Sequence, residues 1–100
     1  PAAYAEACRI QDQCRAEETR LFAGVDLLLS PAALGAAPRG LHATGDPAFS
    51  RLTTALGVPC LGFRAGEDGG LPLGLQLIGR TGADRALLAS APALIAAMTA

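Results

Sequence analysis

The chain has 100 residues, which suits one small domain spanning 1–100. Its formal net charge is −1 and all eight basic residues are arginines, so charge gives no reason to expect nucleic acid or an anionic membrane as a partner, and chemistry that needs a lysine amine cannot be completed within this chain. Hydrophobic residues make up 51% but aromatic residues only 4%, so we expect a thin core that packs against another copy or a missing part of the same chain.

The first predicted element is a helix over residues 3–22. Apolar residues recur at spacings of three, four and seven from Ala3 through Ile10 to Leu21, which gives one narrow apolar stripe. Gly24 follows as a stop signal.

A short strand is predicted next, over residues 25–29. Its sequence, VDLLL, is almost continuously apolar, as is typical of a strand covered on both faces. From residue 32 to residue 45 glycine, proline and alanine dominate and no period holds. This stretch is longer than most connections, and such loops are either functional or surface excursions that packing alone holds in place.

The second helix is predicted over residues 47–56, and it has signals at both ends. Asp46 is a favoured N-cap, and Pro47 suits the first helical position. Gly57 stands where a left-handed C-cap belongs.

Two strands are predicted over residues 58–63 and 71–79. The connector between them, RAGEDGG, is rich in turn residues, so the two strands should form an antiparallel hairpin. In the second strand leucines alternate onto one face, and Gly74 on the other face indicates the close approach of another backbone.

The last predicted element is a helix over residues 84–98, capped by Asp84 and kinked or restarted near Pro92. The order of elements predicts an α/β fold, in which a small mixed sheet of about three strands packs with helices.

Cys8, Cys14 and Cys60 are an odd number without CxxC spacing, so we expect free thiols in a reducing cytoplasm. No uninterrupted apolar run approaches the ~18 residues of a transmembrane helix, and no signal peptide is visible. The start at Pro1 rather than Met fits a processed start or a fragment.

Several residues could carry chemistry, but each also has a structural explanation. Cys60 and His42 could form a nucleophile–base pair, yet a cysteine within an apolar strand usually packs as a small hydrophobe. His42 has no partners at metal-ligand spacing, and a surface loop histidine is the favoured interpretation.

Asp46 could contact a substrate amine or amide, although its role as N-cap already explains it. The EDGG run is better explained as a turn than as a phosphate nest, because its two acids oppose anion binding. Pro1 could act as an N-terminal base only with a processed start and a pocket. The sequence contains no GxSxG nucleophile motif, no HExxH zinc-binding motif, no P-loop and no dinucleotide-binding fingerprint.

Four ordered motifs extend from residue 25 to about residue 91. They are an Asp–hydrophobic–Leu–x–x–Pro run at Asp26 to Pro31, a Gly–x–Pro at Gly57 to Pro59, the run GLPLGLQLIG at Gly70 to Gly79, and an acid followed by paired leucines at Asp84 to Leu88. In these motifs the chain resembles the C-terminal part of the amidase signature family.

The resemblance implies hydrolysis or transfer of amide C–N bonds by a Ser–Ser–Lys triad that lies upstream of this region. No catalytic residue carries over, since this chain lacks that core and any lysine. We expect no cofactor and no metal, because the sequence shows no metal-ligand spacing. By position, the candidate pocket-wall residues are Thr44, Asp46, Phe49 and Cys60.

Two hypotheses follow for the whole chain. In the first, it is the C-terminal region of a larger amidase, inactive alone, with the rest of that chain as partner and a small amide as substrate. In the second, it is a stand-alone structural or binding module that covers its exposed sheet face by forming a homodimer.

Overall fold

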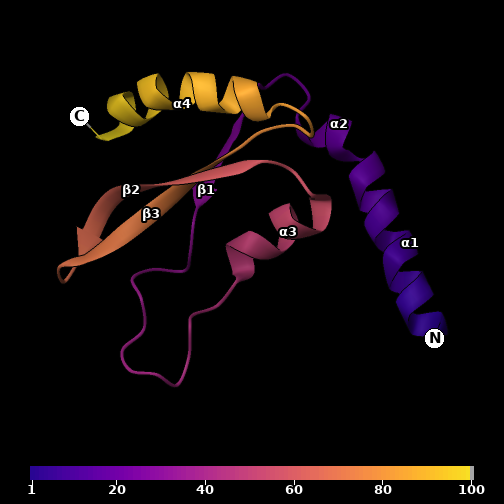
Figure 1. Cartoon of the computed structure of the whole chain (residues 1–100), viewed down its shortest axis with the longest axis horizontal. Coiled ribbons are helices and arrows are strands. Elements are labelled where there is room, and N and C mark those ends of the chain that lie inside the picture. Colours follow the sequence, from indigo (N-terminus) through magenta and orange to yellow (C-terminus); the bar gives the residue numbers. More distant parts are fainter. Residues whose placement is uncertain (100) are drawn as a thin grey trace.

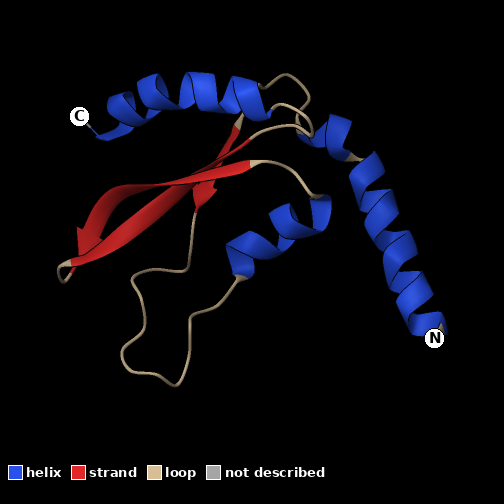
Figure 2. Ribbon diagram, viewed as in Figure 1, coloured by secondary structure: helices blue, strands red, loops and turns tan. Residues whose placement is uncertain are grey.

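The structure is a computed structural model that describes residues 1–99 (Figure 1). Its elements in chain order are α1 (Ala2–Ala16), α2 (Glu18–Leu21), β1 (Leu28–Pro31), α3 (Ala48–Leu56), β2 (Cys60–Asp68), β3 (Leu71–Ile78) and α4 (Asp84–Thr99). Figure 2 shows the three strands as one sheet, with α4 along one side and α3 on the other.

The sheet has the strand order β1-β3-β2, and β3 is antiparallel to both neighbours. The predicted α/β class and the three strands are confirmed, but the prediction of a mixed sheet is wrong. β1 and β2 run in the same direction, and β3 lies between them. No parallel ladder therefore forms within residues 1–99.

The β2–β3 hairpin is antiparallel as predicted, but its strands are longer and its turn is shorter. β2 continues to Asp68, past the predicted end at residue 63, and only Gly69 and Gly70 turn. Both glycines have positive φ, 57° and 84°, which suits the tight turns that join hairpin strands. The register shifts between Arg64 and Gly66, so the charged RAGED run forms a bulged edge strand rather than a loop.

The N-terminal region differs from the predicted helix over residues 3–22. The helix breaks at Glu17, and the four-residue α2 leads into Phe22, which is fully buried. β1 begins at Leu28, three residues after the predicted start of the strand over 25–29. Local backbone bonds turn this segment, among them that from the Val25 N–H to the Phe22 carbonyl, and Arg80, distant in sequence, also hydrogen-bonds the carbonyls of Phe22 and Val25.

The ends of α3 correct one capping prediction and confirm another. Pro47 occupies the N-cap position and no side chain caps the helix, so the predicted N-cap role of Asp46 is wrong. Gly57 is left-handed, with φ 70°, and its N–H donates to the Thr53 carbonyl at 3.0 Å. In the last element, α4 is one continuous helix with Pro92 inside it, so the helix does not restart there. A kink at Pro92 stays a prediction.

The core consists of two clusters on opposite faces of the sheet. Leu77 packs with Leu87 and Ala91 of α4, whereas its neighbour Ile78 packs with Phe22 and with residues around α3. Adjacent residues of a strand point to opposite faces, so β3 contributes to both clusters.

Much apolar surface stays open in the described part of the chain. Seven hydrophobic residues are buried, whereas twelve large hydrophobic side chains are exposed. Leu71, at the hairpin end of β3, is 46% exposed, and Leu29 of β1 is 53% exposed. Single exposed hydrophobic residues are ordinary, but this ratio indicates a surface that another body covers.

A polar clasp joins the N-terminal helices to the exit from β3. The Arg80 guanidinium donates to the carbonyls of Phe22 and Val25 at 2.9 and 2.8 Å, and its Cζ lies 5.6 Å from the centre of the Phe22 ring. The backbone N–H and the hydroxyl of Thr81 both donate to the Glu18 carboxylate at 2.6 Å. These bonds span about sixty residues of sequence and orient α2 against the sheet.

Replacing Arg80 tests the clasp. Arg80→Ala removes two charge-assisted hydrogen bonds and a cation–π contact, so we expect the free energy of unfolding to fall by about 1–2 kcal/mol in denaturant titrations. Arg64→Ala is the matched control, because Arg64 pairs only with the exposed Glu67, and its loss should cost at most about 0.5 kcal/mol. Equal effects of the two substitutions would contradict the clasp.

Glu18 makes the clasp sensitive to pH. The hydrogen bonds from Thr81 hold the pKa of the Glu18 carboxyl below its ordinary value of 4.5. The folded pKa is below the unfolded one, so this stabilisation is complete above the unfolded pKa and is lost as pH falls through the folded pKa. The difference in unfolding midpoint between wild type and Glu18→Gln should therefore shrink between about pH 6 and about pH 3. A difference that stays constant over this range would show that the charge of Glu18 is irrelevant.

Candidate functional site

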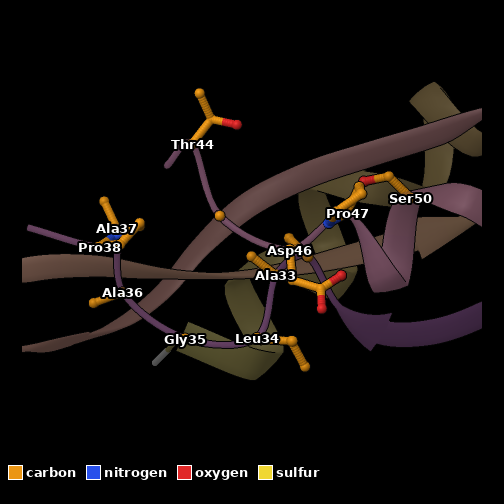
Figure 3. Close-up of a pocket in the computed structure, with 12 residues that line it drawn as sticks. Ala33, Leu34, Gly35, Ala36, Ala37, Pro38, Thr44, Asp46, Pro47 and Ser50 are labelled. Atoms are coloured by element: carbon orange, nitrogen blue, oxygen red, sulfur yellow. The ribbon is translucent and has the colours of Figure 1, made fainter. Parts of the chain in front are cut away.

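The segment between β1 and α3 forms a hollow whose lining includes polar side chains. We call residues 32–47 the pocket loop. The loop folds over a cavity of about 560 Å³, which is within the range of small-molecule sites (Figure 3). Ala32–Pro38 form one side of it, and Thr44–Pro47 with Ser50 form the other.

The walls are mostly small and apolar, and the polar groups gather on the second side. The side chains with polar groups are those of Thr44, Asp46 and Ser50, and Asp46 is the only charged residue among those that line the cavity. In the view of Figure 3 the Asp46 carboxylate and the Thr44 side chain extend in opposite directions. A carboxylate on an otherwise neutral wall accepts hydrogen bonds from a protonated amine or from amide N–H groups.

The other two candidate pocket-wall residues lie elsewhere. Phe49 is half-buried in α3 and is not among the residues that line this cavity, but its carbonyl oxygen accepts a hydrogen bond from Gln76 at 2.9 Å. Cys60 begins β2 and borders a separate hollow of about 160 Å³ beside α4. The structure therefore brings Thr44 and Asp46 to one cavity and places Cys60 at another.

The cysteines and the histidine are at the surface or close to it. All three cysteines are free, and Cys60 is exposed, so the prediction that it packs as a buried hydrophobe is wrong for this chain. His42 is exposed in the pocket loop. Within residues 1–99 no three His, Cys, Asp or Glu side chains gather as metal ligands would. None of the helices described has the length and apolar character that crossing a bilayer requires.

Sequence reasoning missed Gln76 as a residue of this region. Gln76 is 7% exposed, and its Nε2 donates to the Ser30 hydroxyl and to the Phe49 carbonyl, both at 2.9 Å. The signal was present, since a polar side chain interrupts an apolar strand that is buried at this point, and buried polar groups need partners. The sequence could not show which partners these are.

Two serine hydroxyls among the described residues donate to backbone carbonyls. The Ser30 hydroxyl donates to the Pro31 carbonyl and the Ser90 hydroxyl donates to the Ala86 carbonyl, so neither is poised on a base. Nucleophilic catalysis needs a hydroxyl or thiol within hydrogen-bond reach of a base, and the bonds found among residues 1–99 include no such pair.

Comparison with known proteins assigns the family. The model of the amidase family, described as "Amidase", matches residues 1–88. The A subunit of glutamyl-tRNA(Gln) amidotransferase from Thermus thermophilus is 36% identical over 96 residues, covering 90% of this chain and 20% of that protein. The same subunit of Parvibaculum lavamentivorans is 36% identical over 101 aligned residues, covering 93% and 20%. That of Synechococcus sp. is 39% identical over 87 residues, covering 78% and 18%.

The chain spans about a fifth of the length of these curated relatives. It corresponds to one region of an amidase. Since the family match extends over residues 1–88 and several relatives exceed 30% identity across most of its length, the chain belongs to the amidase family.

Proposed function

We propose that this chain is the C-terminal region of an amidase, where it extends the sheet and supplies one wall of the substrate pocket. The reaction is the hydrolysis or transfer of an amide C–N bond, carried out by a Ser–Ser–Lys core in the rest of the enzyme. The observation that carries the proposal is the cavity of the pocket loop, which has a single carboxylate and no nucleophile–base pair among the described residues. The matched relatives are named as amidotransferase subunits, which supports amide chemistry.

The partner we propose is the remainder of an amidase chain. Twelve large hydrophobic side chains are exposed, and a groove of about 680 Å³ between α4 and the segment at Asp26 and Leu27 is lined mainly by apolar surface. Both outer edges of the sheet are also unpaired within residues 1–99. A body that supplies the other four-fifths of the enzyme would cover these features. With three free thiols, the cytoplasm is the compartment that we propose.

The substrate we propose is a small amide with a protonated amine or N–H group near the scissile bond. Asp46 would accept hydrogen bonds from that group, and Thr44 and Ser50 line the same cavity. Phe49 would not contact the substrate. Its carbonyl oxygen, which accepts a hydrogen bond from Gln76, would help to hold the start of α3 beside the pocket loop. Cys60, at the other hollow, would contact neighbouring protein rather than substrate.

A chimera tests this function. This chain replaces the matching region of the Thermus thermophilus protein, and amide hydrolysis is measured for the chimera and for the 100-residue chain alone. We expect hydrolysis by the chimera and none by the chain, because the chain has no lysine to act as base. Hydrolysis of simple amides by the purified chain would overturn the proposal.

The carboxylate is tested in the same chimera. Asp46→Asn should raise KM for an amine-bearing amide by about 10-fold or more, because a charge-assisted hydrogen bond is lost, while kcat changes less. Asp12→Asn, on the exposed side of α1, is the matched control and should leave KM unchanged. Identical KM values for the two variants would exclude Asp46 from the pocket.

Sedimentation of the isolated chain distinguishes between the two possible partners, the remainder of an amidase and a second copy of this chain. If the remainder of an amidase is the natural cover, the chain alone should associate weakly and without a defined stoichiometry. A discrete, stable homodimer would instead favour the stand-alone module.

A further inference from the structure

The pocket loop is attached to the sheet only at its two ends. It leaves β1 after Pro31 and enters α3 after Pro47. Within residues 1–99, the hydrogen bonds that join loop residues to other elements are made by the Ala32 N–H at one end and the Pro47 carbonyl at the other. The shape of the cavity therefore depends on how far apart these two ends are held.

Gln76 of β3 connects the two ends. Its Nε2 donates to the Ser30 hydroxyl of β1 at 2.9 Å and to the Phe49 carbonyl of α3 at 2.9 Å, with the Pro31 carbonyl at 3.4 Å. An amide nitrogen has two protons, and here they are directed to two different segments. Gln76 is 7% exposed, so water does not readily replace these bonds.

Gly74 acts on the same face of β3, two residues earlier. Its carbonyl accepts the Ala32 N–H at 3.0 Å, where the loop departs from β1. A Cβ built on Gly74 would lie 3.2 Å from the Ala32 Cβ and 3.5 Å from the Phe63 carbonyl oxygen. The first of these distances is tighter than most real Cβ contacts, so a side chain here would require Ala32 to shift by a few tenths of an ångström.

We propose that Gly74 and Gln76 form a stem clamp, a pair of positioning residues on β3 that set the separation of the two ends of the pocket loop. Gly74 lets the first end lie against the strand, and Gln76 ties that end to the start of α3. The clamp thereby fixes the width of the cavity. The role of the clamp in holding the pocket loop is independent of the proposed function. Only the effect of the clamp on substrate binding rests on that function.

The Ala32 amide is a direct probe of the clamp, and NMR hydrogen exchange on the 100-residue chain reads it out. Gln76→Glu replaces the donor by a carboxylate that can only accept, so exchange protection of the Ala32 N–H should fall by about 10-fold or more at neutral pH. In acid the introduced carboxyl is protonated and its single O–H can restore one of the two bonds, so protection relative to wild type at the same pH should recover in part. A loss that does not recover at all would overturn the donor role of Gln76.

Gln11→Glu is the matched control. Gln11 also donates its Nε2 to a backbone carbonyl, that of Ala55 at 2.9 Å, near the C-terminal end of α3. The substitution should leave Ala32 protection within about 2-fold of wild type, because it breaks a bond of the same kind without touching the clamp. The Leu87 amide of α4, which donates to the Ala83 carbonyl at 2.9 Å, reports whether the rest of the fold is intact in every variant.

Gly74→Ala provides an independent test. The added methyl should lower Ala32 protection, and the double variant Gly74→Ala with Ala32→Gly should restore it, because the second change removes the atom that the methyl meets at 3.2 Å. Effects of the two substitutions that simply add would overturn the role of Gly74.

The chimera connects the clamp to the substrate. If the clamp shapes the pocket, Gln76→Glu raises KM at neutral pH more than it lowers kcat, and the rise is partly reversed in acid. A fall in Ala32 protection with unchanged KM would keep the clamp and overturn the pocket assignment. Unchanged Ala32 protection would overturn the clamp whatever the kinetics show.

Discussion

Strand β3 is hydrogen-bonded along both edges, and every other part of the sheet is placed relative to it. β1 pairs with one edge and β2 with the other, so two segments separated by about thirty residues are held by one strand. Alternation of side chains then sends Leu77 toward α4 and Gln76 and Ile78 toward the other face. One strand therefore organises the core on both faces and the polar contacts beneath the pocket loop.

Local patterns predicted the parts of the fold that depend on local physics. The alternating leucines of β3 and the hairpin could be predicted from the sequence, and so could the left-handed Gly57, because each depends on residues close together in the chain. The neighbour of β1 in the sheet, and so the direction of its pairing, could not be predicted in the same way. Whether β1 lies beside β2 or beside β3 decides between a mixed and an antiparallel sheet, and the residues of β1 are equally suited to both.

The errors at the element ends occur where distant segments make contact. The helix break at Glu17 and the late start of β1 accompany contacts that Arg80 and Thr81 make from across the molecule. For the candidate site, the sequence pointed to the region that contains Thr44 and Asp46, but Gln76 was overlooked because its acceptors belong to β1 and α3. Local propensity has no information about a bond between residues 27 or 46 positions apart.

The two edges of the sheet are unlike each other, and this limits which strands can be added to them. β1 exposes only four residues and ends in Pro31, which has no N–H to offer a further strand. β2 is nine residues long, but the shift at Arg64 to Gly66 and the Arg64–Glu67 ion pair interrupt its outer side. Indiscriminate strand addition is disfavoured at both edges, so a segment that joins here must match a short run or accommodate a bulge. The length of β1 and the bulge of β2 therefore restrict which strands can pair with the edges of the sheet.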